Sequence, residues 1–212
     1  MPLEKIERIN EGRTWALWRI EESLEQLREL FKPEGDDLQC LEEIHHPEKK
    51  REWLASRLAL KALVKHAGEN YEGTYDDEYG KPHLKNCPFH ISISHSKAFA
   101  AAILCKNTPV GIDVEPLGPK LNHIVPRVLN TSELTISSQQ TSLLCVYWCV
   151  KEVIYKLYGK RKISLRDNIY VHPFTLQDEG ICQAELNFEG INTVYTLKYL
   201  KVDNHFVAFN IN

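Results

Sequence analysis

Hydrophobic positions near the start of the chain follow first a strand pattern and then a helical one. Residues 13–20, RTWALWRI, are dense in aromatic and aliphatic side chains and predict a strand. Over residues 24–31 leucines and Phe31 recur at helical spacing, which predicts a short amphipathic helix. Pro33–Asp36 is expected to end that helix, because proline and glycine interrupt helical structure.

A longer helix and three short strands are predicted next. Residues 47–66 carry a stripe of apolar side chains, Pro47 suits a first helical turn, and Gly68 follows the end. Short apolar segments after it predict strands at Thr74–Tyr75, Phe89–Ile93 and Phe99–Cys105.

The second half of the chain repeats this order of strand, helix and strands. A short strand is predicted over Val110–Glu115, followed by a break at Pro116–Pro119 and a helix from about Ser142 to Tyr158 that Gly159 ends. Two turn pairs, Glu189-Gly190 and Asp203-Asn204, predict hairpins among the last strands. Those four strands are expected at Ile169–Leu176, Ile181–Phe188, Thr193–Val202 and His205–Ile211.

The repeated order, without shared residue identity, leads us to expect a structural duplication. The predicted fold class is α+β, with two similar α/β lobes and a cleft between them. The boundaries expected for the lobes are residues 1–109 and 110–212.

Composition narrows the class of protein. Of 212 residues, 43% are hydrophobic and 26% charged, which is typical of a folded chain, and a net charge of -3 argues against a nucleic-acid binder. Met1–Lys5 carries charge where a signal peptide would be apolar, and no stretch is apolar enough to cross a membrane, so we expect a cytoplasmic protein. The six cysteines are scattered and are expected to be reduced.

Two carboxylates lie on the predicted strand over Val110–Glu115. Strand alternation places Asp113 and Glu115 on one face, with Ile112 and Val114 on the other. Paired carboxylates at this spacing suit magnesium, which prefers oxygen ligands. Two solvated acids at a strand end would account for the same spacing.

The helix ending at Tyr158 carries a second candidate group. Glu152 and Lys156 are four residues apart and share one face, where they could form an ordinary surface ion pair. The other surface of this helix is strongly apolar, so Lys151 and Lys156 bracketing the acid indicate a helix edge that faces a cleft.

Polar residues also follow the strand at Phe89–Ile93. Ser94-His95-Ser96 offers several donors to a phosphate, although hydroxyl-rich turns also occur without function. A Ser-His hydrolase would need an elbow of the Gly-x-Ser-x-Gly type, which the sequence lacks.

A loop upstream would display a lysine. In Gly80-Lys81-Pro82 the glycine permits a tight turn and the proline stiffens the chain, although such a loop is often only a hairpin turn. Arg51 and Arg57 on the preceding helix could add positive charge for a phosphate.

Taken in order, these motifs resemble the 4'-phosphopantetheinyl transferases of the two-lobed type that activates peptide and polyketide synthetases. The resemblance extends over about residues 51 to 156, and Gly-x-Asp-x-Glu followed by Trp-x-x-Lys-Glu-x-x-x-Lys is its most specific part. Departures from the family pattern occur at Ser92, Lys97, Leu129 and Val153.

The resemblance implies roles for these residues. Asp113, Glu115 and Glu152 would be ligands of Mg²⁺, and Lys156 would contact the phosphate at the bond that breaks. Lys81 would reach the nucleotide phosphates, and Ser94 and His95 would contact coenzyme A.

The reaction implied is transfer of the phosphopantetheine arm of coenzyme A to a serine of an apo acyl or peptidyl carrier protein, with Glu152, Lys156 and His95 as the catalytic residues. The alternatives are a magnesium-dependent nucleotide or diphosphate hydrolase and a non-catalytic module that binds carrier proteins. Because a duplicated chain would contain its own cleft, a monomer is expected.

Overall fold

The computed structural model describes residues 3–137, 140–160 and 162–212, so Met1 and Pro2 of the predicted N-terminal segment lie outside it. The contacts within the chain separate it into two units, Met1–Val110 and Gly111–Asn212. We call these the N-terminal unit and the C-terminal unit. Each unit combines helices with antiparallel sheet, which confirms the α+β class.

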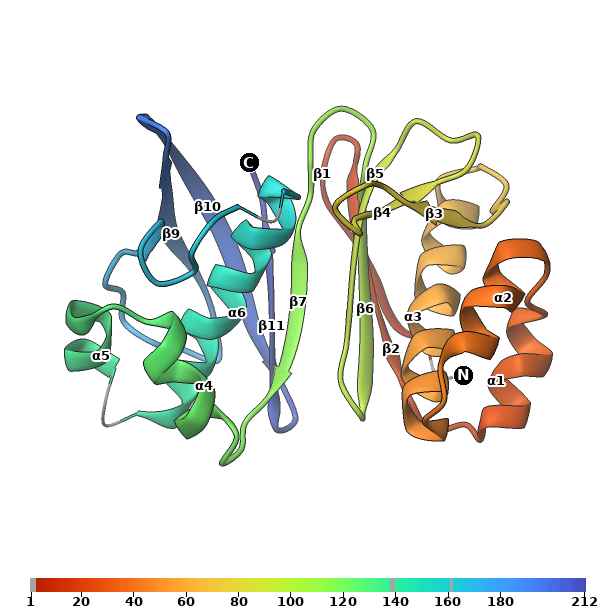
Figure 1. Cartoon of the computed structure of the whole chain (residues 1–212), viewed down its shortest axis with the longest axis horizontal. Coiled ribbons are helices and arrows are strands. Elements are labelled where there is room, and N and C mark those ends of the chain that lie inside the picture. Colours follow the sequence, from red (N-terminus) through yellow and green to blue (C-terminus); the bar gives the residue numbers. More distant parts are fainter. Residues whose placement is uncertain (1–2, 138–139, 161) are drawn as a thin grey trace. The chain divides into compact units, whose positions relative to one another are not determined.

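The N-terminal unit is built on a four-stranded sheet in the order β1-β2-β6-β5 (Figure 1). All neighbouring strands in it are antiparallel. A separate two-stranded sheet pairs β3 with β4. The strands are β1 (Leu3–Asn10), β2 (Arg13–Arg19), β3 (Thr74–Asp76), β4 (Pro82–Leu84), β5 (His90–His95) and β6 (Phe99–Cys105).

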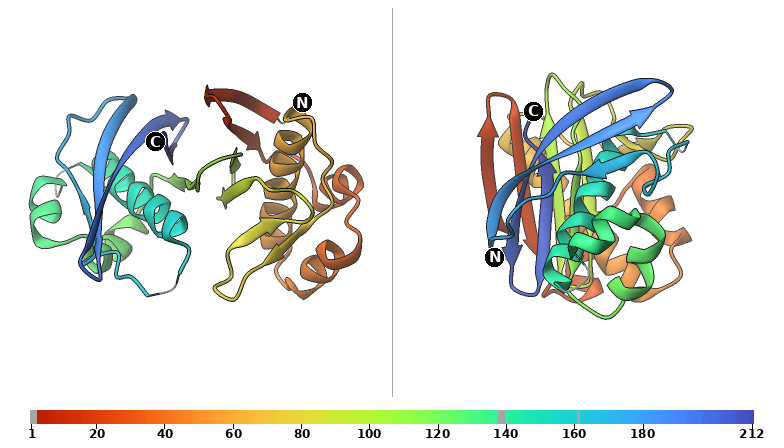
Figure 2. Two further views of the ribbon diagram at one scale, coloured as in Figure 1. Left: turned by 90° about the horizontal axis from the view of Figure 1, so that it is seen from above. Right: turned by 90° about the vertical axis from the view of Figure 1, so that its left-hand side faces the viewer.

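Three helices follow β2 in the N-terminal unit: α1 (Leu24–Phe31), α2 (Gly35–Glu43) and α3 (Pro47–His66). In both views α3 lies between the sheet and the other two helices (Figures 1 and 2). Ala55, Leu58 and Leu63 of α3 belong to the same buried cluster as Ala16 of β2 and Ala102 of β6. The small alanines on the strands allow the helix to approach the sheet closely.

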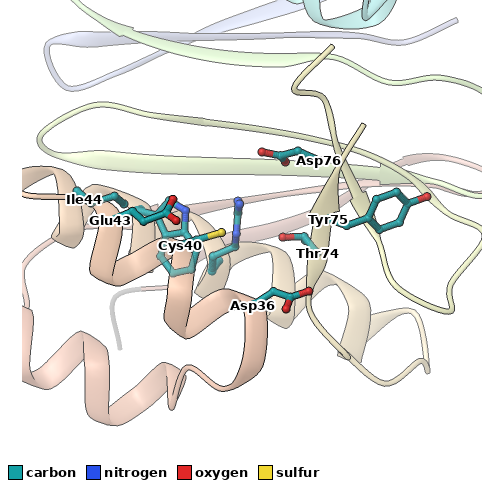
Figure 3. A pocket seen from close by; sticks show the side chains of 9 residues that line it. Asp36, Cys40, Glu43, Ile44, Thr74, Tyr75 and Asp76 are labelled. Carbon is teal, nitrogen blue, oxygen red and sulfur yellow. The ribbon is translucent and has the colours of Figure 1, made fainter. Parts of the chain in front are cut away.

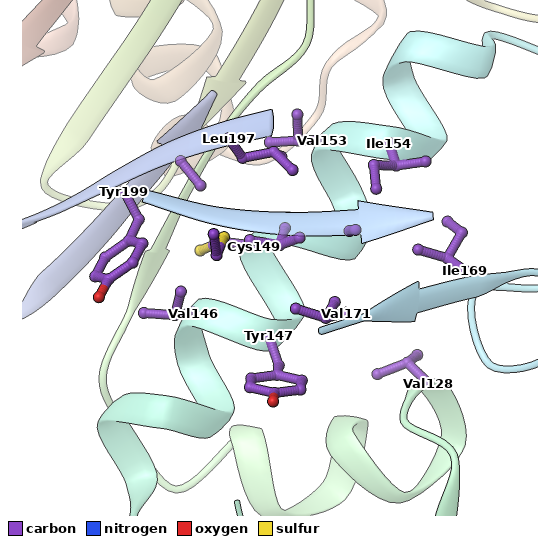
Figure 4. Packing of buried hydrophobic residues seen from close by; sticks show 14 of the residues in the cluster. Val128, Val146, Tyr147, Cys149, Val153, Ile154, Ile169, Val171, Leu197 and Tyr199 are labelled. Atoms are coloured by element: carbon purple, nitrogen blue, oxygen red, sulfur yellow. The ribbon is translucent and has the colours of Figure 1, made fainter. Parts of the chain in front are cut away.

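The C-terminal unit contains a five-stranded sheet in the order β7-β11-β10-β9-β8. The long helix α6 packs on it, and the core of this unit lies between them (Figure 4). The strands are β7 (Ile112–Pro116), β8 (Ile169–Val171), β9 (Glu179–Phe188), β10 (Ile191–Val202) and β11 (His205–Asn210), and the helices are α4 (Leu121–Val128), α5 (Thr131–Ser137) and α6 (Thr141–Tyr158).

The long predicted elements are confirmed. The helix predicted over 47–66 has these bounds, with Pro47 in its first turn, and Gly159 ends α6 with a φ of 69°. Both predicted hairpin turns are present, because Phe188 pairs with Ile191 and Val202 pairs with His205.

The short elements were predicted less well. The charged strand β1 and the short elements α2, β4, α4 and α5 were not predicted, and the strand expected over Ile169–Leu176 ends at Val171. These segments have too few apolar residues to show a period of their own. The helix predicted over residues 24–31 ends at Phe31, before Pro33, as expected, and α2 begins at Gly35.

Both units run from strand through three helices to further strands, with the third helix the longest. A duplication would explain this shared order, and it stays a prediction. No helix among the described residues is long and apolar enough to span a membrane. All six cysteines are free thiols.

Gly111 stands where the chain entering β7 lies against α6. A Cβ atom at this position would be 2.4 Å from the carbonyl oxygen of Val153, so a backbone would have to move to admit it. The glycine of the Gly-x-Asp-x-Glu motif is therefore required by packing between β7 and α6.

We expect Gly111→Ala to lower the free energy of unfolding by about 1–3 kcal/mol, the usual cost of overpacking a core. Urea denaturation measures the loss. Gly118→Ala is the matched control, since a Cβ there meets no heavy atom within 4 Å, and a change of similar size in both variants would contradict the packing argument.

Candidate active site

The site in the C-terminal unit is built on one edge of α6. Trp148, Glu152 and Lys156 follow one another at intervals of four residues and are partly buried, whereas most of the helix is fully buried. Residues four apart lie on the same face of a helix. The three side chains therefore form a stripe along the accessible edge of α6.

The acids of β7 face this helix. In the pairing of β7 with β11, Asp113 lies opposite Ala208 and Glu115 opposite Phe206. Ala208 and Phe206 belong to the cluster that packs against α6. Because neighbours opposite each other in a sheet share a face, Asp113 and Glu115 point to the side of the sheet that α6 covers.

Lys156 joins the helix to the strand. Its Nζ donates to Asp113 Oδ1 at 2.7 Å and to the carbonyl oxygen of Ile112 at 3.0 Å. The Asp113 side chain is only 3% exposed, so Lys156 supplies the positive charge that a buried carboxylate needs. Lys156 was predicted at this site, but its contact with Asp113 was not.

The remaining two acids are held in an unfavourable environment for negative charge. Burial, followed by the negative charge of Asp113, raises the pKa of Glu152 to about 7. The same two causes raise the pKa of Glu115 to about 7, with Trp148, Lys156 and Lys120 acting in the opposite direction. Asp113, Glu115 and Glu152 are thus close enough to repel one another, and Lys156 offsets only part of that repulsion.

The predicted metal ligands are near one another without forming a ready-made ligand cluster. Within the described ranges, no three His, Cys, Asp or Glu side chains are gathered so that they could hold a metal ion. The chemistry of the donors nevertheless fits Mg²⁺, because three carboxylates crowd one region and Lys156 offsets only part of their negative charge. The role of these acids as ligands stays a prediction.

Lys151 does not face the site, contrary to our expectation that it brackets Glu152 together with Lys156. It is fully buried on the opposite side of α6, where Nζ contacts Glu133 Oε2 at 2.7 Å and the carbonyl oxygens of Leu165 and Ile169 at 2.9 and 2.7 Å. A lysine with three partners is stable in the core, so the role of Lys151 is structural.

Glu133 completes this buried group. Its Oε2 accepts from the backbone N–H of Asn130 at 2.8 Å and its Oε1 from that of Val171 at 2.9 Å. Asn130 in turn accepts from the Glu133 N–H at 3.0 Å, which forms a capping box at the start of α5. The pair of Lys151 and Glu133 thus ties α5, α6 and β8 together.

The candidate phosphate-binding lysine of the N-terminal unit is displayed by a tight turn. Asp77 Oδ1 accepts from the backbone N–H groups of Tyr79 and Lys81 at 2.9 and 3.0 Å, and Gly80 has a φ of 81°. A hydrogen bond from His83 at 3.0 Å is the main cause that lowers the pKa of Asp77 to about 2. Burial lowers the pKa of Lys81.

His95 is held by an acid that we did not single out from the sequence. Its Nδ1 lies 2.9 Å from Oε2 of Glu52, a buried residue of α3. Ser94 is buried on the same strand, whereas Ser96 exchanges hydrogen bonds with the backbone of Phe99 in the turn after β5. Ser96 therefore shapes the turn, and His95 is the exposed residue of the three.

The two arginines proposed for phosphate binding, Arg51 and Arg57, differ in their contacts and in their burial. Arg51 donates from Nε to the carbonyl oxygen of Glu22 at 3.0 Å and pairs with Glu48 at 3.5 Å, so its guanidinium is engaged within the unit. Arg57 is buried, and its guanidinium carbon lies 4.8 Å from the centroid of the Trp53 ring.

Arg57 lines a pocket of about 450 Å³ in the N-terminal unit (Figure 3). Asp36, Glu43 and Asp76 line the same pocket, although Nε and Nη1 of Arg57 are buried without a hydrogen-bond partner among the described residues. Acids at this density disfavour a phosphate, and the contact of Arg57 with coenzyme A stays a prediction. The lining residues are Asp36, Cys40, Glu43, Ile44, Trp53, Arg57, Thr74, Tyr75 and Asp76.

Comparison with known proteins identifies the segment that carries the acids. Residues 109–208 match the model of the 4'-phosphopantetheinyl transferase superfamily. This segment contains Asp113, Glu115, Glu152 and Lys156, and its match agrees with the resemblance found from the motifs. The 4'-phosphopantetheinyl transferase of Bacillus subtilis is 32% identical to this chain over 117 residues, which are 51% of this chain and 50% of that protein. The chain thus spans about half the length of this relative.

The buried pair gives a prediction about stability. Lys151→Met leaves Glu133 charged in the core, so we expect the free energy of unfolding to fall by about 3 kcal/mol or more in urea denaturation. Lys198→Met in the same unit removes an ion pair with Glu179, whose side chain is 59% exposed. This variant should lower the free energy of unfolding by less than about 1 kcal/mol. Equal losses in the two variants would show that the core pair has no special role.

The raised pKa of Glu152 predicts a dependence of stability on pH when divalent ions are absent. Between about pH 4.5 and about pH 7 the folded protein keeps a proton on Glu152 that the unfolded chain has lost, so stability falls as the pH rises through this range. Glu152→Gln cannot ionise, and its melting temperature should exceed that of the wild type at pH 8.

Thermal denaturation of the wild type and of Glu152→Gln, in the presence of a chelator at pH 4.5 and at pH 8, checks this dependence of stability on pH. The two proteins should melt at similar temperatures at pH 4.5, where Glu152 is protonated in the folded state. If the melting temperatures of the variant and the wild type differ by the same amount at both pH values, ionisation of Glu152 is not the cause of that difference.

Proposed function

We propose that the protein transfers the 4'-phosphopantetheine arm of coenzyme A to a serine hydroxyl of an apo acyl or peptidyl carrier protein, in a reaction that uses Mg²⁺. The observation that carries the proposal is the group formed by Lys156, Asp113, Glu115 and Glu152 within a segment of the 4'-phosphopantetheinyl transferase superfamily.

The serine hydroxyl is a weak nucleophile and must lose its proton during the reaction. Its oxygen forms a bond to the phosphorus next to the pantetheine arm, and the diphosphate bond to the nucleotide breaks and releases adenosine 3',5'-bisphosphate. Without a bound cation, burial and Asp113 raise the pKa of Glu152 to about 7, and beside Mg²⁺ the carboxylate would stay ionised and able to accept a proton. Glu152 would accept the serine proton.

The departing phosphate gains negative charge as the bond breaks. Lys156 lies on the same helix edge as Glu152 and carries its ammonium group at Asp113, so it would stabilise that charge. Asp113, Glu115 and Glu152 would hold Mg²⁺, which supplies further positive charge to the diphosphate. Lys81, Ser94 and His95 would contact the rest of coenzyme A.

Incubation of apo carrier proteins with coenzyme A, Mg²⁺ and the enzyme, followed by intact-mass measurement, tests the proposal. The carrier mass should increase by one phosphopantetheine, and Asp113→Ala or Glu152→Gln should lower the rate by about 100-fold or more. Asp178→Asn is the matched control, because that carboxylate is 91% exposed in the same unit, and its rate should equal that of the wild type.

Two results would overturn the proposal. Release of adenosine 3',5'-bisphosphate without any gain in carrier mass would identify a hydrolase. Binding of carrier protein with no turnover of coenzyme A, in the presence of Mg²⁺, would identify a binding module.

A further inference from the structure

Glu52 is a buried acid whose carboxylate faces a histidine of the neighbouring strand. It belongs to the second turn of α3, and its side chain is 3% exposed. Oε2 lies 2.9 Å from His95 Nδ1 and accepts from Lys49 Nζ at 2.6 Å. A carboxylate so deeply buried is costly unless it is paired, so these two contacts account for its presence there.

The two partners of Glu52 differ in how firmly they are held. The Lys49 side chain is 61% exposed and belongs to the same helix, so it can leave the carboxylate at little cost. The His95 side chain is 33% exposed and comes from β5, 43 residues along the chain. The contact with His95 is therefore the one that joins two elements of the unit.

The charge of Glu52 determines where the protons of His95 lie. An ionised carboxylate only accepts hydrogen bonds, so Nδ1 of His95 must carry a proton. A neighbouring negative charge also favours the protonated imidazole, in which Nε2 donates as well. Lys49 approaches the same carboxylate from α3, and the position opposite His95 on β6 is Ala100.

We propose that Glu52 is a positioning residue: it holds the His95 ring through Nδ1–H and so presents Nε2–H to a phosphate group of coenzyme A. The inference rests on the proposed function, because it takes His95 to be a contact of coenzyme A. The new element is that the contact of His95 with coenzyme A depends on Glu52, which itself does not contact the substrate. This is the arrangement by which a carboxylate behind a histidine fixes the ring and its protonation in other sites.

The first test is kinetic. Glu52→Gln keeps an acceptor for Nδ1–H and removes the negative charge, so the KM for coenzyme A should rise by about fivefold or more, while kcat changes less than about twofold. Lys65→Met, at an exposed position near the end of the same helix, is the control and should leave both values near those of the wild type. In the His95→Gln background, Glu52→Gln should have no further effect on KM.

The second test is independent of activity and of any variant at Glu52. Nitrogen-15 NMR of the histidine ring in the wild-type protein should show the Nδ1-protonated tautomer when His95 is neutral, with His95→Gln identifying its signals.

The outcomes separate this inference from the proposed function. A wild-type protein that modifies carriers, with an unchanged KM in Glu52→Gln and an Nε2-protonated His95, would overturn the positioning role and leave the function intact. A wild-type protein that modifies no carrier overturns the function, and the role of Glu52 toward coenzyme A with it, even if NMR shows that the two side chains are coupled.

Discussion

The C-terminal unit depends on the burial of one charged side chain. Lys151 lies at zero exposure on α6 and is held by Glu133 and two backbone carbonyl groups. A helix turns by about 100° per residue, so a helix that points residue 151 into the core must direct residues 152 and 156 toward its edge. The rotation of α6, and with it the placement of Glu152 and Lys156, follows from a pair that takes no part in the site itself.

The three neighbouring acids of the candidate active site in the C-terminal unit are unfavourable for folding. Lys156 neutralises Asp113, but Glu115 and Glu152 are left with pKa values raised to about 7 by burial and by Asp113. Acids kept in such an arrangement at a cost in stability are typical of functional sites. The same crowding explains both proposals for Glu152, because an acid with a raised pKa can accept a proton and a group of acids attracts a divalent cation.

In the N-terminal unit, too, carboxylates contact the segments that carry the candidate substrate-binding residues. Asp77 arranges the turn that displays Lys81, and Glu52 holds the ring of His95. In the first case the carboxylate accepts from the backbone of the turn, and in the second it contacts the imidazole ring. Loops and strand ends would otherwise leave such side chains in several rotamers, so these acids reduce the entropy that substrate binding would have to overcome.

The amino-acid sequence was sufficient for the long elements and for the motif residues. Helical spacing marks α3 and α6, turn residues mark the hairpins of the last strands, and the spacing of Asp113, Glu115, Glu152 and Lys156 points to one family. These features are local, because periodicity and turn chemistry act over a few residues. The match of residues 109–208 to the 4'-phosphopantetheinyl transferase superfamily agrees with that resemblance.

Contacts between distant residues were decided by the tertiary structure alone. Lys151 and Lys156 look alike in the sequence, yet one is buried with Glu133 and the other holds Asp113, and only the packing of α6 on the sheet distinguishes them. Glu52 lies 43 residues from His95, and although an acid on the buried stripe of α3 was visible in the sequence, its partner was not. Pairing across such separations depends on how helices and strands pack, which no local pattern records.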